Sequence, residues 1–216
     1  MKDVNPTEGA PLTRALRRLM SAPVGRARAY SLLQRTVGQE RLLRRFVDEA
    51  LALTPGDRVL DVGCGPADVL AALPAGVRYT GLEPHPPYLA GARRRFGPTA
   101  DLRGARVEEL PAGALFERVL LMGVLHHLPD PEASALLRAC LARRAPGGAV
   151  VALEPCPRPG RGWVEQQLYA IDRGRFVRSE QALRALVCAG APAARFDVWE
   201  GMLRVPYTYV VVRIAG

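Results

Sequence analysis

Short apolar runs and amphipathic segments alternate along most of this chain. The apolar runs read as buried strands, at residues 58–61, 77–82, 101–104, 118–122, 149–153, 194–199 and 207–214. In other segments apolar residues recur at helical spacing. This spacing predicts helices at residues 12–20, 29–37, 40–53, 67–73, 86–96, 131–144 and 179–189. The alternation of strands and helices predicts an α/β fold, with a doubly wound and mostly parallel sheet covered on both faces.

The two ends of the chain depart from this alternation. Residues 194–199 and 207–214 are joined by a short link without room for a crossover helix, so these strands are expected to lie antiparallel or far apart. Residues 1–50 are predicted to form an N-terminal helical cap, ahead of the sheet domain at residues 51–216. Arg14, Arg17 and Arg18 lie opposite the apolar face of the first helix in this cap. That basic amphipathic helix leaves peripheral membrane contact open, although packing on the domain edge is the favoured interpretation.

Composition narrows the functional classes. The 216 residues are 49% hydrophobic with a formal net charge of +9, which suits one globular domain. The basic residues are spread out, and no dense basic run interleaves aromatics, so we do not expect a nucleic-acid partner. The four cysteines lack Cys-x-x-Cys spacing, which argues against a zinc site or a disulfide framework. No apolar run approaches the roughly 20 residues that span a bilayer. We therefore expect a cytoplasmic protein with no bound metal and no transmembrane segment.

Two strand ends carry the residues that indicate a ligand, because ligands of doubly wound sheets bind at the carboxyl ends of the strands. The first strand ends at Asp61 and runs into Gly63 and Gly65, which let the backbone pass close to a ligand. A dinucleotide-binding turn would carry a third glycine where Asp68 stands, so this turn suits a ligand without phosphates. Glu83 follows the second strand, 22 residues after Asp61, where an acid can accept both hydroxyls of a ribose. A buried Asp61 needs a positive or donating partner, such as the ammonium of an amino acid.

Together these segments resemble the class I S-adenosylmethionine-dependent methyltransferases. Residues 59–65 look like the first motif of that family, Glu83 like its ribose-binding acid, and residues 106–111 like the segment that flanks the adenine. Residues 116–128 resemble the fourth strand and its loop, and residues 146–154 the turn and fifth strand. The resemblance covers residues 51–214 and implies a seven-stranded sheet with an antiparallel last strand. One residue departs from the pattern, because Arg106 stands where members usually carry an acid that contacts the adenine.

The resemblance implies S-adenosyl-L-methionine as the cofactor and assigns residues around it. The expected cofactor-binding residues are Asp61, Gly63, Cys64, Gly65, Glu83, Pro84, Val107, Met122 and Tyr30. Gly63 and Gly65 would lie under the methionine portion, and Met122 near the sulfonium. Pro84 and Val107 would lie beside the adenine. Tyr30 would reach the site from the N-terminal cap.

The acceptor is expected beside the fourth and fifth strands. His127 and His126 follow the fourth strand, where the family places substrate-facing residues, and Glu154 ends the fifth. These three are the candidate catalytic residues, with His127 ranked first as a general base. The alternative is that they brace the loop. Residues 155–178 are predicted to form a lid over the site. Within this lid the expected substrate-binding residues are Trp163, Tyr169, Asp172 and Arg175.

These inferences predict methyl transfer from S-adenosyl-L-methionine to a small-molecule acceptor, with hydroxyl oxygen preferred over nitrogen or carbon. Two alternatives stay open. One is an RNA or protein methyltransferase that uses the positive charge of the chain. The other is a partner protein that binds the cofactor without catalysis. The sequence leaves the identity of the acceptor and the oligomeric state open.

Overall fold

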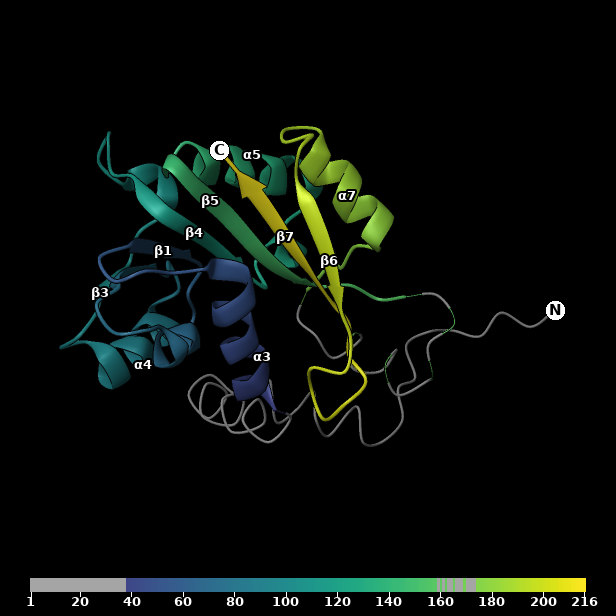
Figure 1. Ribbon diagram of the computed structural model, residues 1–216, viewed down its shortest axis with the longest axis horizontal. Coiled ribbons are helices and arrows are strands. Elements are labelled where there is room, and N and C mark those ends of the chain that lie inside the picture. Colours follow the sequence, from purple (N-terminus) through teal and green to yellow (C-terminus); the bar gives the residue numbers. More distant parts are fainter. Residues whose placement is uncertain (1–37, 159, 161, 163–164, 166–168, 170–173) are drawn as a thin grey trace.

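One sheet forms the centre of the described structure (Figure 1). The computed structural model describes residues 38–158, 160, 162, 165, 169 and 174–216. The strands are β1 (Arg58–Val62), β2 (Arg78–Leu82), β3 (Asp101–Arg103), β4 (Phe116–Met122), β5 (Arg144–Pro155), β6 (Arg195–Trp199) and β7 (Tyr209–Ala215). They form a seven-stranded sheet in the order β3-β2-β1-β4-β5-β7-β6. The helices predicted at residues 12–20 and 29–37 lie outside the described residues, as do Tyr30, Trp163 and Asp172.

The strand directions confirm the predicted topology. β1 pairs in parallel with β2 and β4, β2 with β3, and β4 with β5. β7 runs antiparallel between β5 and β6. The short link between β6 and β7 explains this reversal, because a parallel neighbour needs a crossover connection of a dozen or more residues. The sheet is therefore doubly wound and mostly parallel, with an antiparallel last strand.

Helices cover both faces of the sheet (Figure 1). α5 (Asp130–Leu141) and α7 (Glu180–Cys188) lie on one face, and α3 (Gln39–Arg45) and α4 (Pro86–Phe96) lie on the other. Neighbouring residues of β1 pack against the helices on opposite faces of the sheet. Leu60 shares a buried cluster with Leu137 of α5, whereas Val59 shares one with Leu89 of α4. This alternation follows from the period of two in a strand. None of the helices in the described part of the chain has the length and apolar character that a membrane crossing requires.

Four shorter helical segments occur among the described residues: the π-helix η1 (Phe46–Leu51) and the 3-10 helices η2 (Asp68–Ala72), η3 (Val107–Glu109) and η4 (Leu125–His127). η2 is shorter than the predicted helix at residues 67–73. Ala67 has a left-handed φ of 57°, and Leu73 is extended. Pro74 follows Leu73 and disfavours a helical conformation there. The segment after β1 is therefore a single tight turn of helix.

Candidate active site

The turn after β1 packs against β2 and against the loop that follows β4. The amides of Gly63 and Cys64 both donate to the Leu82 carbonyl, at 2.8 and 3.0 Å. Gly63 and Gly65 have φ values of 70° and 55°, in the region that favours glycine. A Cβ on Gly63 would lie 3.0 Å from Val124 Cγ2, whereas a Cβ on Gly65 would meet no atom within 4 Å. Gly63 is therefore tightly packed, and Gly65 borders open space.

Glu83 connects this turn to the end of β2. Its side chain is buried, with 7% of the residue exposed. Oε2 accepts from the Gly65 amide at 2.9 Å, and Oε1 accepts from the His85 amide at 2.7 Å. A carboxylate has about four lone-pair sites, so these two bonds leave acceptor capacity on both oxygens. Glu83 can thus hold the turn and still accept hydrogen bonds from ligand hydroxyls.

Asp61 is a buried acid with one unsatisfied oxygen. Tyr79 donates its hydroxyl to Oδ2 at 2.7 Å, whereas Oδ1 is buried without a hydrogen-bond partner in the described structure. Burial raises the pKa of Asp61 to about 7, against the opposing effect of the Tyr79 hydrogen bond and with help from the charges of Glu83 and Asp68. The site lacks one donor or one positive charge. The ammonium group of an S-adenosylmethionine methionine portion would supply it, so these residues fit the cofactor that the motifs imply.

The other expected cofactor residues differ in accessibility. Pro84 is exposed, and Met122 is half-buried at the end of β4. Cys64 is buried, which raises the pKa of its thiol well above the usual range and keeps the thiol protonated. Val107 is 1% exposed and packs in the core, so its side chain is not displayed on the surface. Arg106 precedes η3, and its amide donates to Glu109 Oε1 at 3.2 Å.

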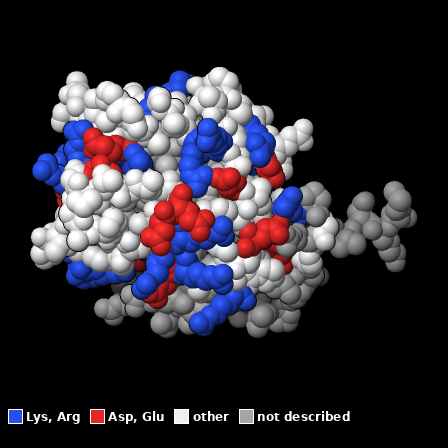
Figure 2. Space-filling model, in the orientation of Figure 1, with Lys and Arg blue, Asp and Glu red and all other residues white. Residues whose placement is uncertain are grey.

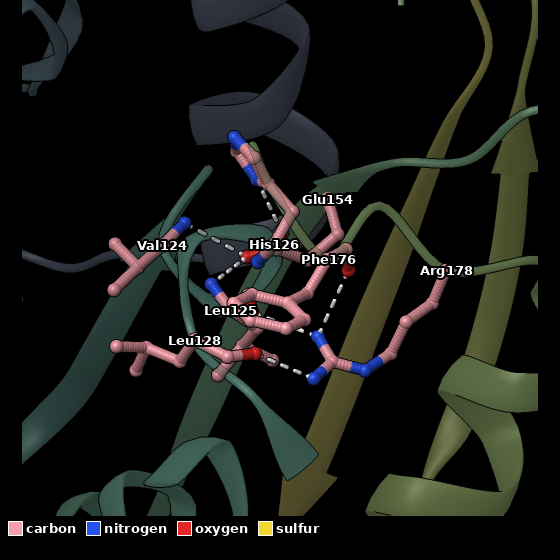
Figure 3. A network of polar contacts seen from close by, with 7 residues as sticks. All are labelled: Val124, Leu125, His126, Leu128, Glu154, Phe176 and Arg178. Atoms are coloured by element: carbon pink, nitrogen blue, oxygen red, sulfur yellow. Dashed lines mark hydrogen bonds and ion pairs between the residues drawn. The ribbon is translucent and has the colours of Figure 1, made fainter. Parts of the chain in front are cut away.

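The histidine pair lies on η4, the single 3-10 turn after β4. Glu154, at the end of β5, lies beside His126 (Figure 3). Glu154 Oε1 accepts from the amides of Val124 and Leu125 at 2.9 and 2.8 Å. Oε2 contacts the amide of His126 at 3.1 Å and His126 Nδ1 at 2.8 Å. His126 is 6% exposed, whereas His127 is exposed, and the two ring centroids are 4.1 Å apart. The carboxylate thus holds the start of the turn, and the turn displays His127.

Two of the predicted substrate-binding residues lie in the described structure. Tyr169 is half-buried, and its hydroxyl accepts from the Thr208 amide at 3.1 Å and donates to the Thr208 carbonyl at 3.0 Å. Burial raises the pKa of Tyr169 above its usual range, so the hydroxyl stays protonated. Arg175 is exposed. No group of His, Cys, Asp and Glu that could hold a metal ion occurs within the described ranges.

Two arginines that sequence reasoning missed hold the loops of the site. Arg95 of α4 donates to the Pro66 carbonyl and pairs with Asp68, directly after the glycine turn. Arg178 donates to the carbonyls of Leu125 and Leu128 around η4. Neither residue belongs to a local motif, and their partners lie 27 to 53 positions away. No local pattern in the sequence identifies such contacts.

Comparison with known proteins identifies the domain. Residues 59–148 match a protein family described as a methyltransferase domain. A ubiquinone biosynthesis O-methyltransferase of Bordetella pertussis is 35% identical over 111 residues, which are 49% of this chain and 45% of that protein. The chain therefore spans about half the length of such curated relatives.

Solved structures extend the similarity to most of the chain. The mitomycin 7-O-methyltransferase MmcR superposes with a TM-score of 0.67 at 19% identity, covering 94% of this chain and 60% of that chain. The O-methyltransferase NcsB1 from neocarzinostatin biosynthesis was solved with S-adenosyl-L-homocysteine and 1,4-dihydroxy-2-naphthoic acid. It superposes with a TM-score of 0.63 at 23% identity, covering 92% of this chain and 60% of that chain. Residues 59–148 are therefore similar to a methyltransferase domain, and the chain has the fold of the class I S-adenosylmethionine-dependent methyltransferases that its motifs resemble.

Proposed function

We propose that this chain transfers the methyl group of S-adenosyl-L-methionine to a hydroxyl oxygen of a small-molecule acceptor. The observation that carries the proposal is the buried Oδ1 of Asp61, which has no donor in the described structure. A ligand that brings a donor or a positive charge to the end of β1 would satisfy this oxygen. The names of the similar proteins describe O-methyltransferases, which supports oxygen as the accepting atom.

The cofactor would be held by residues from two neighbouring strands. Asp61 would accept from the ammonium of its methionine portion, and the remaining lone pairs of Glu83 would accept from the ribose hydroxyls. Gly65 would leave room for the ligand, because it borders open space. Met122, at the end of β4, would lie near the sulfonium. The bound cofactor supplies an electrophilic methyl carbon.

The protein would then orient the acceptor, exclude water and remove a proton. Orienting a nucleophile in line with a methyl group can contribute roughly 7 to 11 kcal/mol. A hydroxyl of high pKa also has to lose its proton as it reacts, and a positioned base accelerates that step. We assign this proton transfer to the imidazole of His127, which η4 displays after β4.

We assign His126 and Glu154 to the support of His127. Four donor atoms surround the Glu154 carboxylate, three backbone amides and His126 Nδ1. An ionised Glu154 favours the tautomer in which Nδ1 of His126 carries the proton. The His126 ring in turn packs against the ring of His127. These contacts would fix the general base without bringing Glu154 to the acceptor.

Several expectations of the sequence stay predictions. They are the roles of Trp163, Tyr169, Asp172 and Arg175 in acceptor binding and of Tyr30, Pro84 and Val107 in cofactor binding. The helical cap at residues 1–50, the lid at residues 155–178 and a cytoplasmic location belong to the same group. So does the independence from a metal ion.

The assignment of His127 is tested by the variant His127→Ala. A panel of substituted catechols and hydroxynaphthoates of graded pKa, including 1,4-dihydroxy-2-naphthoic acid, would be offered with methyl-labelled S-adenosyl-L-methionine. If His127 is the base, kcat falls by about 10²- to 10⁴-fold for acceptors that are protonated at the assay pH. The loss shrinks for acceptors that are already ionised. The Kd of S-adenosyl-L-homocysteine, measured by calorimetry, stays the same.

Two outcomes would contradict the proposal. A uniform loss across the panel, together with a lower melting temperature, would show that His127 only braces the loop. Tight cofactor binding by the wild-type protein without transfer to any acceptor would favour the non-catalytic partner protein.

A further inference from the structure

The single turn η4 is held at its C-terminal side by one buried arginine, Arg178 (Figure 3). The Arg178 side chain is 8% exposed. Its Nη1 donates to the Leu125 carbonyl at 2.7 Å and to the Phe176 carbonyl at 3.3 Å. Nη2 donates to the Leu128 carbonyl at 2.7 Å, and both Nε and Nη2 donate to Asp130 Oδ1, at 2.9 and 2.7 Å. A guanidinium has five N–H donors, so the acceptors match its full donor capacity.

The two ends of the turn are therefore held by opposite charges. Glu154 accepts from the amides of Val124, Leu125 and His126, where a helical turn exposes unpaired N–H groups. Arg178 donates to the carbonyls at the other end, where a cation is favourable. Arginine suits this place because its planar fork reaches several acceptors at fixed angles. A lysine ammonium has three donors and no such plane.

The segment that carries Arg178 is also bonded to the histidine pair. The amide of Phe176 donates to the His126 carbonyl at 2.9 Å. A Cβ on Gly174 would come within 2.1 Å of His126 Cδ2, so the backbone of residue 174 packs directly on the imidazole. Residues 174–178 and the turn η4 are thus joined by hydrogen bonds and by packing on the His126 ring. The exposed ring of His127 extends from this turn.

We propose that Arg178 is a positioning residue that fixes η4 and thereby sets the direction of the His127 imidazole toward the acceptor. This inference rests on the proposed function, in which His127 receives the acceptor proton. Arg178 acts through the backbone of the turn and does not touch the reacting atoms. The hydrogen bonds of Arg178 go to residues 125, 128, 130 and 176, and none of these belongs to the glycine turn after β1 or to Glu83 after β2.

The first test is the variant Arg178→Lys, which keeps the charge and removes the planar fork. Since a displacement of about 1 Å can cost on the order of 10²-fold in rate, we expect kcat to fall by about 10- to 100-fold. The Kd of S-adenosyl-L-homocysteine should not change. Arg184→Lys on α7 is the matched control, because Arg184 forms a partly exposed pair with Glu180 and should leave kcat unchanged.

A double-mutant cycle separates positioning from a general loss of structure. If Arg178 acts through His127, then adding Arg178→Lys to His127→Ala should lower kcat by no more than about twofold. If Arg178→Lys lowers kcat in the His127→Ala background by the same factor as in the wild-type background, the inference is overturned. If His127→Ala alone leaves kcat unchanged, the base assignment is what fails.

Amide hydrogen exchange tests the inference without an activity assay. In the cofactor-free protein, Arg178→Lys should increase exchange at residues 125–128 by about tenfold or more, relative to Arg184→Lys, while β1 and β2 stay protected. Unchanged exchange in the turn would overturn the inference. Should Arg178→Lys fail to fold, Asp130→Ala replaces it as the test, because the Asp130 side chain is 76% exposed and binds the same guanidinium. The variant Asp130→Ala should lower kcat by a smaller factor, and this effect should disappear in the His127→Ala background. If the effects of Asp130→Ala and His127→Ala on kcat are instead independent, the inference is overturned.

Discussion

At the scale of single residues, Asp61 shows a conflict between stability and ligand binding. The acid is fully enclosed, and its Oδ1 lacks a donor among the described residues. Replacing the carboxylate with a neutral group of the same shape would relieve that conflict in the free protein. The same replacement would remove the charge that we expect to hold the cofactor ammonium. Residues of this kind are typical of binding sites, where local stability is lower than the fold allows.

The variant Asp61→Asn should therefore change the pH dependence of stability. The pKa of Asp61 is about 7 in the folded protein, whereas the ordinary pKa of an exposed aspartate is 3.8. The protonated Asp61 therefore contributes its full stabilisation below about pH 4, and this contribution is lost as the pH rises toward 7. Over this range the free energy of unfolding falls by at most about 1.4 kcal/mol per pH unit. The stability of Asp61→Asn relative to wild type should rise between pH 5 and about pH 7.

Melting temperatures of the cofactor-free proteins across this range provide the measurement. Asp48→Asn controls for the loss of one negative charge, because Asp48 is exposed. A difference between Asp61→Asn and wild type that stays constant with pH would contradict the elevated pKa of Asp61.

At the scale of elements, the start of α7 connects the loop after β4 to the helical layer. Ser179 is the N-cap of α7, and its Oγ accepts from the Ala182 amide at 3.3 Å. Arg178, the residue before it, donates to the carbonyls around η4. One short stretch of chain therefore both begins a helix and fixes a loop after another strand. The two contacts can be separated by mutation.

Ser179→Ala should lower the free energy of unfolding by about 1 kcal/mol, because a helix amide loses its acceptor. It should leave kcat unchanged, in contrast to Arg178→Lys. Urea unfolding and the acceptor assay provide the two measurements. Ser179→Asp retains an acceptor at the N-cap and should preserve stability. A loss of kcat in Ser179→Ala equal to that of Arg178→Lys would show that the order of α7, rather than the guanidinium, fixes the loop.

At the scale of the whole molecule, the net charge of +9 comes from 30 basic and 21 acidic residues that are spread along the chain. On the face shown in Figure 2, arginines alternate with acidic residues. Several arginines are held in ion pairs, such as Arg58 with Glu117 and Arg103 with Asp101. A surface of this kind has a weak field, since neighbouring charges of opposite sign cancel. We therefore expect the face shown in Figure 2 to attract RNA only weakly.

The alternative of an RNA methyltransferase can be tested by binding. We expect the Kd for a fluorescently labelled transfer RNA to be weaker than about 10 µM at about 150 mM salt, as for non-specific contacts. Fluorescence anisotropy over a salt series measures both affinity and slope. Sub-micromolar binding at this salt, with a slope that corresponds to about six or more phosphate contacts, would support the RNA alternative.

Local patterns in the sequence were sufficient for the order of elements and for the glycine turn. Apolar runs and helical spacing are properties of consecutive residues, so the strands, α4 and the antiparallel end could be predicted from the chain alone. The positions of Gly63, Gly65 and Glu83 directly after β1 and β2 could also be predicted, because the end of a strand and a glycine turn are visible in a few consecutive residues. Tertiary structure alone decided that Glu154 accepts from η4, that Arg95 pairs with Asp68 and that Arg178 closes the turn. These contacts join residues 27 to 53 positions apart, and no periodicity encodes which distant side chains meet once the strands have paired.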